Sequence, residues 1–314
     1  MSSLPPDVTA SVATAVAPSG AAVPAEARQR GRALAAAMPY LQALPLWLVM
    51  GIFLLVPIAT IVIVSFWDDQ ETAFVPAFLW DNYRDVFGTS VTLTTYLSTL
   101  RYAVIVWVFT LGIGFTVAYV LAFHIRSTLW QMVLFQVCAV PFLTSNVIRM
   151  ISWIPFLGRN GLLNQTLADL HIVDHPLEFL LFSPFAVCLT FVHLYSLFMV
   201  VPIFNTMMRI DRALVEAARD AGAGPIAVMR HVIIPLSLPG ISIGTIFVVT
   251  LVMGDFVTVQ MMSGGQSASV GLLIKNEISL LQYPEAAAHA VILLLTVLMM
   301  IWAMLRVVDI RKEL

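Results

Sequence analysis

The sequence predicts an all-α, polytopic membrane protein with about six transmembrane helices and a short cytoplasmic helix between the fourth and the fifth. Of its 314 residues, 60% are hydrophobic and 11% are charged, whereas about 25% of a soluble domain is charged. Long apolar stretches recur along the chain and alternate with short polar segments. The composition therefore excludes a soluble domain, and the net charge of -2 gives no support to nucleic-acid binding.

Six stretches are long enough to cross a hydrocarbon core of about 30 Å, which takes about 20 helical residues. They are residues 44–66, 101–123, 129–152, 184–204, 238–261 and 287–308. Pro57, Pro141, Pro202 and Pro239 lie in or beside these stretches. Because proline lacks an amide hydrogen, we expect kinks or early helix ends at these positions.

The first 40 residues differ from the rest of the chain. They are rich in Ala, Ser, Pro and Val and show no helical face before Arg28, a composition typical of disorder. We therefore predict a mostly disordered N-terminal tail, residues 1–40, and a transmembrane domain, residues 41–314. The apolar stretch after the tail is too long for a signal-peptide core and lacks a small-residue cleavage site, so we expect it to stay as an uncleaved first span.

Arginine and lysine are retained on the cytoplasmic side of short loops, and their distribution predicts the orientation. With the N-terminus inside, the cytoplasmic segments contain Arg28, Arg30, Arg32, Arg126, Arg209, Arg212, Arg219, Arg230, Arg306, Arg311 and Lys312. The opposite side contains Arg84, Arg101, Arg159 and Lys275. Both termini and the loop before the fifth span are therefore expected in the cytoplasm.

Common catalytic signatures are missing from the sequence. It contains no phosphate-binding loop, no His-Glu-x-x-His and no Gly-x-Ser-x-Gly motif. We therefore expect neither an enzyme nor a cofactor bound by this chain. His171 and His175 have helical i, i+4 spacing beside Asp174, but no other ligand is near, so we expect no metal site.

Cys138 and Cys188 fall inside predicted spans without metal-ligand spacing. Small buried side chains are the simpler interpretation of both. Gly240 and Gly244 form a Gly-x-x-x-Gly pair that allows a neighbouring helix to approach closely. That neighbour is either a helix of the same chain or one of a second subunit.

The loop before the fifth span predicts two short helices. Arg212 and Glu216 are four residues apart and Glu216 and Arg219 three, a spacing at which opposite charges support a helix. Gly222 permits the turn that ends it, and Pro225 suits the first turn of a second helix. A docking surface for another protein is one interpretation, and an amphipathic segment on the lipid surface is the other.

This loop resembles the signature of permease subunits of binding-protein-dependent ATP-binding-cassette (ABC) importers. That signature is Glu-Ala-Ala, three residues, Gly, nine residues, then Ile-x-Leu-Pro. Residues 216–222 read Glu-Ala-Ala-Arg-Asp-Ala-Gly and residues 232–235 read Val-Ile-Ile-Pro, so the spacing is intact. The resemblance implies a coupling helix seated in a groove of an ATPase, with the motif residues Glu216, Ala217, Ala218, Asp220, Gly222 and Pro235.

A narrower resemblance, to the spermidine/putrescine class of permease, covers the chain from Tyr102 to its C-terminus. It rests on Pro-Phe-Leu-Thr-Ser-Asn-Val-Ile-Arg at 141–149, Gly-Arg-Asn-Gly-Leu-Leu-Asn at 158–164, Gly-Asp-Phe-Val at 254–257, and a Gly pair at 264–265. Permeases that resemble this class also import other amine-bearing or unrelated solutes. The resemblance implies a polyamine or a related organic cation as the solute.

Two charges fall inside predicted spans, Asp255 in the fifth and Arg149 late in the third. Each would cost about 2.5–3.5 kcal/mol at the bilayer centre, so each should face a partner or a water-filled path. Asp255 is either a binding or gating carboxylate for a cationic solute, a partner of Arg149 in an ion pair, or a residue near the interface. Further candidates for the solute path or gate are Asn146, Trp153, Tyr195 and Phe256, although aromatic residues at membrane depth also pack or anchor.

The sequence therefore predicts a permease subunit of an ATP-driven importer in the inner membrane of a bacterial cell. The expected partners are a second permease subunit, two cytoplasmic ATPases that bind ATP and Mg, an external solute-binding protein and membrane lipid. The alternative is a channel or a secondary transporter driven by an ion gradient. Against it stand the motif spacing and the lack of an evident inverted repeat.

Overall fold

The computed structural model describes residues 38–40, 42–70 and 73–307. Nearly all of the predicted tail, residues 1–40, lies outside the described residues, so its disorder stays a prediction. The chain divides into two units, residues 1–59 and 60–314.

The first unit contributes an apolar helix that continues into the start of the second. The helix runs from Met38 to Val64 and includes a π-helical turn, η1 (Gly51–Leu55), followed by α2 (Val56–Val64). Pro57 has no amide hydrogen to donate to the preceding turn, and the π turn ends two residues before it. No residue of η1 or α2 is buried, which suits a span that faces lipid.

A short hairpin that the sequence analysis did not predict lies at one end of the second unit. Its strands β1 (Asp68–Gln70) and β2 (Ala73–Val75) pair antiparallel, and α3 (Asp81–Gly88) follows. The ring of Phe66 stacks on Phe78 at 4.6 Å and meets Trp80 edge-on at 5.2 Å between centroids. Aromatic clusters of this kind favour the membrane interface.

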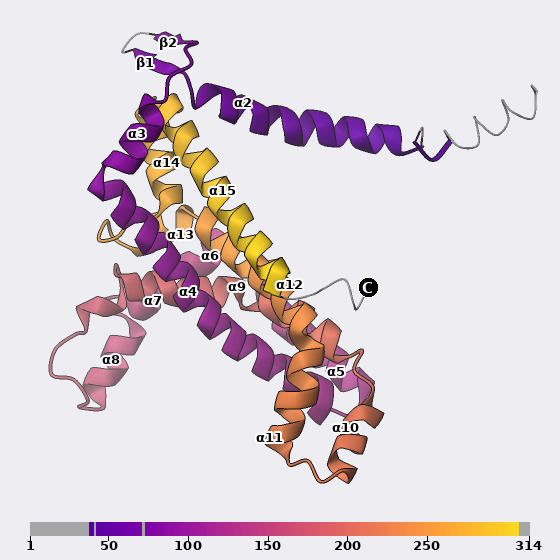
Figure 1. Ribbon diagram of the computed structural model, residues 1–314. Helices are drawn as coiled ribbons and strands as arrows, with labels where there is room; N and C mark the ends of the chain where they lie inside the picture. The colour runs from indigo at the N-terminus through magenta and orange to yellow at the C-terminus, as the bar shows by residue number, and fades with distance from the viewer. Residues whose placement is uncertain (1–37, 41, 71–72, 308–314) are drawn as a thin grey trace, which may run out of the picture. The chain divides into compact units, whose positions relative to one another are not determined.

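Three helices form the centre of the second unit: α4 (Ser90–Tyr119), α9 (Pro184–Met207) and α12 (Ile234–Gly254) pack against one another (Figure 1). α4 begins at Ser90, earlier than the predicted residue 101. Its first turns are polar, and the hydroxyls of Thr95 and Thr99 donate to backbone carbonyls one turn back, at 2.9 Å each. Hydropathy detects the membrane core and therefore misses these turns. α4 ends in a π-helical turn, η2 (Val120–His124).

Glycines let these three helices approach closely at Met199, which is fully buried on α9. A Cβ atom at Gly114 of α4 would lie 2.6 Å from Met199 Cγ, and one at Gly244 of α12 would lie 2.7 Å from its Sδ. A Cβ atom at Gly240 would lie 2.5 Å from the carbonyl oxygen of Pro202 on α9. The Gly240 and Gly244 pair therefore packs against a helix of the same chain.

The third predicted span, residues 129–152, is not one helix. α5 (Thr128–Ala139) continues as the 3₁₀ turn η3 (Val140–Leu143), and α6 (Asn146–Ile151), α7 (Trp153–Leu157) and α8 (Leu162–Asp169) follow. The chain turns by 91° at the break between Leu143 and Asn146. Pro141, inside η3, cannot donate the amide hydrogen that continues an α-helix, which accounts for the change from α5 to a 3₁₀ turn before the break.

The fifth predicted span, residues 238–261, is wrong at both ends. The helix starts with α11 (Pro225–Val228), passes through the π turn η5 (Met229–Ile233) into α12, and stops at Gly254. α13 (Val257–Met262) is a separate short helix. Asp255 therefore lies at a helix break.

The remaining elements complete the second unit. α9 is preceded by the 3₁₀ turn η4 (Glu178–Leu180), and α10 (Arg212–Asp220) lies between α9 and α11. α14 (Val270–Ser279) packs against α15 (Tyr283–Val307), and a buried Glu277–His289 contact of 3.1 Å joins them. Within the described residues, five helices are long and apolar enough to cross a membrane, and the number is six when the bent third segment is counted as one span. This confirms the prediction of about six spans in an all-α protein.

Candidate functional site

The motif loop forms the predicted helix, glycine turn and second helix. Asp211 caps α10, because its side chain accepts a hydrogen bond of 2.9 Å from the amide of Ala213. Gly222 has a φ of +86°, a left-handed conformation that favours glycine. Its amide donates to the carbonyl of Arg219 at 2.9 Å, and the amide of Ala223 donates to that of Ala218 at 3.0 Å, which together close the helix end.

The ion pairs predicted to support α10 are not formed. Within the described part of the chain, Glu216 pairs with neither Arg212 nor Arg219. The Asp211 cap was readable in the sequence, one residue before Arg212, but was missed. Arg212 instead reaches the end of α4, where its guanidinium donates to the carbonyl of Ala122 at 3.4 Å. α10 is thereby bonded to the second membrane span.

The outer face of α10 is open to solvent. Glu216, Ala217, Asp220 and Gly222 are exposed, whereas Val215 on the opposite face is buried. A Cβ atom at Gly222 would meet nothing within 4 Å, so the space above the turn is free for another surface. In Figure 1, α10 and α11 lie at the end of the second unit opposite α3 and the hairpin. Pro235, by contrast, lies in the first turn of α12.

Asp255 is held by neutral hydrogen-bond donors. Tyr195 of α9 donates to its Oδ2 at 2.6 Å, and the hydroxyl of Thr258 donates to the same oxygen at 2.7 Å. The amide of Thr258 donates to Oδ1 at 2.9 Å, so the carboxylate also satisfies an amide in the first turn of α13. Thr258 was not a predicted site residue, although a polar residue three positions after Asp255 is a readable capping pattern.

Arg149 contacts residues other than Asp255. It donates to the side chain of Asn146 and lies over the ring of Phe142 at 4.5 Å from the centroid. Its Nε and Nη1 atoms are buried and have no hydrogen-bond partner among the described residues. An Arg149–Asp255 ion pair does not occur in the described structure. The ion-pair alternative for Asp255 is therefore not supported.

The predicted aromatic residues do not form one cage. Tyr195 is buried against Asp255, whereas Trp153 donates its indole N–H to Nδ1 of His193 at 3.1 Å. Phe256 is 37% exposed. His193 and Phe142 were missed as neighbours of the site, because only the bent third segment brings residues 142–153 against α9.

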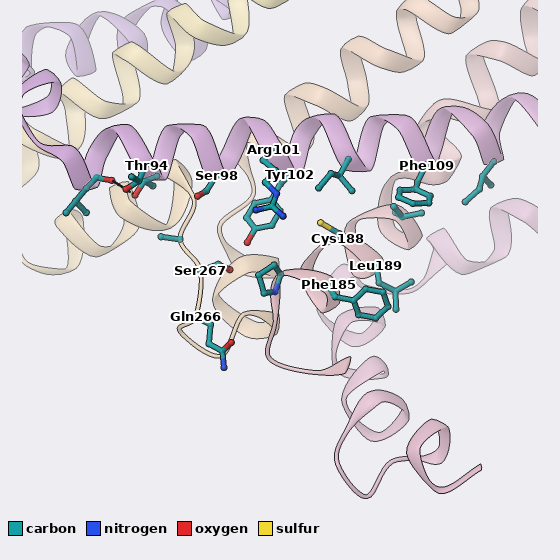
Figure 2. Close-up of a pocket in the computed structure, with 17 residues that line it drawn as sticks. Thr94, Ser98, Arg101, Tyr102, Phe109, Phe185, Cys188, Leu189, Gln266 and Ser267 are labelled. Atoms are coloured by element: carbon teal, nitrogen blue, oxygen red, sulfur yellow. Dashed lines mark hydrogen bonds between the residues drawn. The ribbon is translucent and has the colours of Figure 1, made fainter. Parts of the chain in front are cut away.

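A pocket of about 910 Å³ lies apart from these residues, between α4, α9 and the segment 266–268 (Figure 2). None of Asn146, Arg149, Trp153, Tyr195, Asp255 and Phe256 lines it. The described residues also contain no group of three or more His, Cys, Asp and Glu side chains placed to bind a metal. Cys138 and Cys188 are free and half-buried.

Comparison with known proteins places the chain among transport proteins. It is 31% identical over 273 residues to the spermidine/putrescine transport system permease protein PotB of Escherichia coli, covering 85% of this chain and 97% of that one. It is also 33% identical over 124 residues to the permease protein PotC of the same organism, covering 40% of this chain and 44% of that one. No family model matches the chain.

Two solved structures have the same fold. One is a crystal structure of a bacterial ABC transporter that imports the acidic polysaccharide alginate, with a TM-score of 0.74, 16% identity, and coverage of 91% of this chain and 99% of that one. The other is the alginate transporter in complex with its alginate-bound periplasmic protein, with a TM-score of 0.72, 15% identity, and coverage of 87% and 94%. At these identities the likeness establishes the fold alone.

Proposed function

The chain belongs to the permease family of ABC importers that includes the spermidine/putrescine permease PotB, and on that premise we propose that it forms half of a translocation path for a polyamine or a related organic cation. A relative of 31% identity that matches along 97% of its length supports this function. The proposed solute rests on that relative and on the unpaired carboxylate of Asp255.

The proposed complex contains a second permease, two ATPases and an external solute-binding protein. The similarity to PotC, a second permease of a spermidine/putrescine system, supports a permease pair, and the alginate transporter with its periplasmic protein supports an external donor. ATP and Mg would bind to the ATPases, because this sequence lacks a phosphate-binding loop. The expected location is the inner membrane of a bacterial cell, with both termini in the cytoplasm.

The coupling role of α10 is supported by its exposed face and by its bonds to the membrane spans. Glu216, Ala217, Ala218, Asp220 and Gly222 would meet the ATPase. Movement of α10 would reach α4 through the Arg212 bond to Ala122, and it would reach the fifth span because α11 runs through η5 into α12. Both spans would then shift together and expose the path to alternate sides.

Asp255 would bind an ammonium group of the solute. Its three hydrogen-bond donors are neutral, so the described structure supplies no cation to balance its charge at membrane depth. Arg149 would stay clear of the carboxylate, held by Asn146 and Phe142. Tyr195 would orient the carboxylate, and Trp153 and Phe256 would border the path.

The test is solute-stimulated ATP hydrolysis by the purified, reconstituted complex with its binding protein. The panel contains polyamines, other organic cations, amino acids and sugars. Stimulation by polyamines supports the whole proposal, whereas stimulation by another solute alone keeps the permease and overturns the polyamine. Purification without an associated ATPase, together with uptake that follows an ion gradient, would support a secondary transporter instead.

A further inference from the structure

The pocket between α4 and α9 is amphipathic along its length. Figure 2 shows Thr94, Ser98, Gln266 and Ser267 toward one end, and Phe109, Phe185 and Leu189 toward the other. Arg101 lies between the two groups and is the only charged residue in the lining. An occupant must therefore combine an anionic, hydrogen-bonding group with an extended apolar part.

The charge of Arg101 is not neutralised within the described structure. No described carboxylate lies within ion-pair distance of it, and its side chain is exposed. A guanidinium offers several N–H donors in a planar fork that matches a phosphate group. A polyamine carries the same sign of charge as Arg101, so this pocket is not a second site for the proposed solute.

The apolar part of the lining has the length of one membrane leaflet. Ile105, Phe109 and Ile113 continue from Arg101 at intervals of four residues, along one face of α4. At 1.5 Å per residue, the distance from Arg101 to Ile113 is about 18 Å, close to the half-thickness of about 15 Å of a hydrocarbon core. Leu189 and Phe185 of α9 form the opposite wall.

We propose that this pocket binds one anionic phospholipid of the outer leaflet. The lipid phosphate pairs with Arg101, the headgroup hydroxyls meet Ser98 and Gln266, and an acyl chain lies between α4 and α9. The lipid fills the space between two of the three central helices and so holds their separation on the outer side. This assignment is independent of which solute the protein carries.

The test uses the full-length protein, with any subunits that co-purify, in detergent supplemented with dioleoyl phosphatidylglycerol or dioleoyl phosphatidylethanolamine. Native mass spectrometry counts the lipid molecules that remain bound. We expect the wild-type protein to retain one phosphatidylglycerol in preference to phosphatidylethanolamine, whose ammonium neutralises its own phosphate. Arg101→Gln should lower that preference about tenfold, because the neutral side chain loses the charge-assisted bond to the phosphate.

Arg159→Gln is the matched control. Arg159 is a second arginine of the outer side, its side chain is 71% exposed, and it lies 3.8 Å from Glu178 and outside the pocket. Its loss should leave lipid retention unchanged, whereas Leu189→Trp should fill the apolar part and reduce retention of both lipids. Equal lipid preference in Arg101→Gln and wild type would overturn the proposal. So would a helix of a partner subunit in the pocket of the intact complex, or displacement of the lipid by spermidine.

Discussion

Asp255 lies at the break between α12 and α13, and its three hydrogen-bond donors are all neutral. The carboxylate therefore has a structural role at the start of α13 and a proposed role in solute binding, which the sequence alone could not distinguish. Oδ1 accepts from the amide of Thr258 in the first turn of α13, and Oδ2 accepts from the hydroxyls of Tyr195 and Thr258. An amine that reaches Oδ2 would replace or join these donors, and α13 would keep its cap.

Asp255→Asn tests the charge separately from the cap. Asparagine retains a carbonyl oxygen for the Thr258 amide, so we expect normal amounts of the protein in the membrane. Loss of a charge-assisted bond to the solute of about 1.5–3 kcal/mol should lower uptake about 10- to 100-fold. Uptake of labelled polyamine by cells, normalised to the amount of protein, measures the effect.

Thr258→Val is the control for the same cluster, since it removes a neutral donor to Oδ2 and keeps the amide that Asp255 caps. We expect a smaller loss of uptake than in Asp255→Asn. Full activity of Asp255→Asn would exclude the carboxylate as a solute site, and its disappearance from the membrane would indicate a structural role alone.

Two substitutions at Gly222 test its role in docking separately from its role in the backbone turn. Its φ of +86° is tolerated by asparagine better than by most residues, and the space around it is open. We expect Gly222→Asn to keep a large part of the uptake and Gly222→Arg to abolish it, because only the arginine side chain reaches far into the ATPase groove. Co-purification of the ATPase with each variant measures the docking directly.

The backbone strain of Gly222→Arg is about 1–2 kcal/mol, too small to remove a membrane protein of this size from the membrane. An equal loss in both variants would therefore assign Gly222 to the turn and not to docking. Normal uptake by Gly222→Arg would contradict the coupling role of α10 altogether.

At the scale of the elements, the sequence predicted helices better than it predicted where they break. Residues 184–204 were nearly correct, because Ser183 and Pro184 mark the start of α9 in the sequence. Residues 129–152 were predicted as one span, since hydropathy stays high through Pro141 and contains no information on the 91° turn that follows. Asp255 was placed inside a span for the same reason. Hydropathy does not show that α12 ends at Gly254 and that α13 begins at Val257.

The packing of α4, α9 and α12 depends on glycines, of which the sequence analysis identified Gly240 and Gly244 but not the residues they pack against. Met199 lies between Gly114 and Gly244. A Cβ atom at Gly114 would lie 2.6 Å from its Cγ, and one at Gly244 would lie 2.7 Å from its Sδ. We expect Gly244→Leu to lower the free energy of unfolding by about 1–3 kcal/mol through overpacking. The measurement is the temperature at which the protein aggregates in detergent, which should fall. Met199→Ala in the same chain should restore part of the loss.

Gly112→Leu is the matched control on α4, because a Cβ atom at Gly112 meets nothing within 4 Å. It should aggregate at the temperature of the wild type. If Gly112→Leu were the more damaging change, the face of α4 that carries Gly112 would be the packed one, against a second subunit.

At the scale of the whole molecule, the two ends of the second unit carry different elements. Figure 1 shows the α10–α11 turn at one end, and α3 with the hairpin at the other. Phe66, Phe78 and Trp80 form an aromatic cluster beside the hairpin. The sequence placed these two ends on opposite sides of the membrane, from the distribution of arginine, and it predicted the fold class from composition and the six apolar stretches. It could not predict how α10 is tied to α4, since the Arg212 bond to Ala122 joins residues 90 positions apart.

The orientation itself can be tested by cysteine labelling in cells. Cys138 and Cys188 are the only cysteines, so replacing both by alanine gives a background without reactive thiols. Arg126→Cys lies between η2 and α5, and Arg159→Cys lies between α7 and α8; both positions are exposed. Because arginine-rich loops are retained in the cytoplasm, a membrane-impermeant maleimide should label Arg159→Cys in intact cells and Arg126→Cys only after permeabilisation. The reverse pattern would put α10 outside the cell, where no ATPase could reach it, and would overturn the importer mechanism together with the orientation.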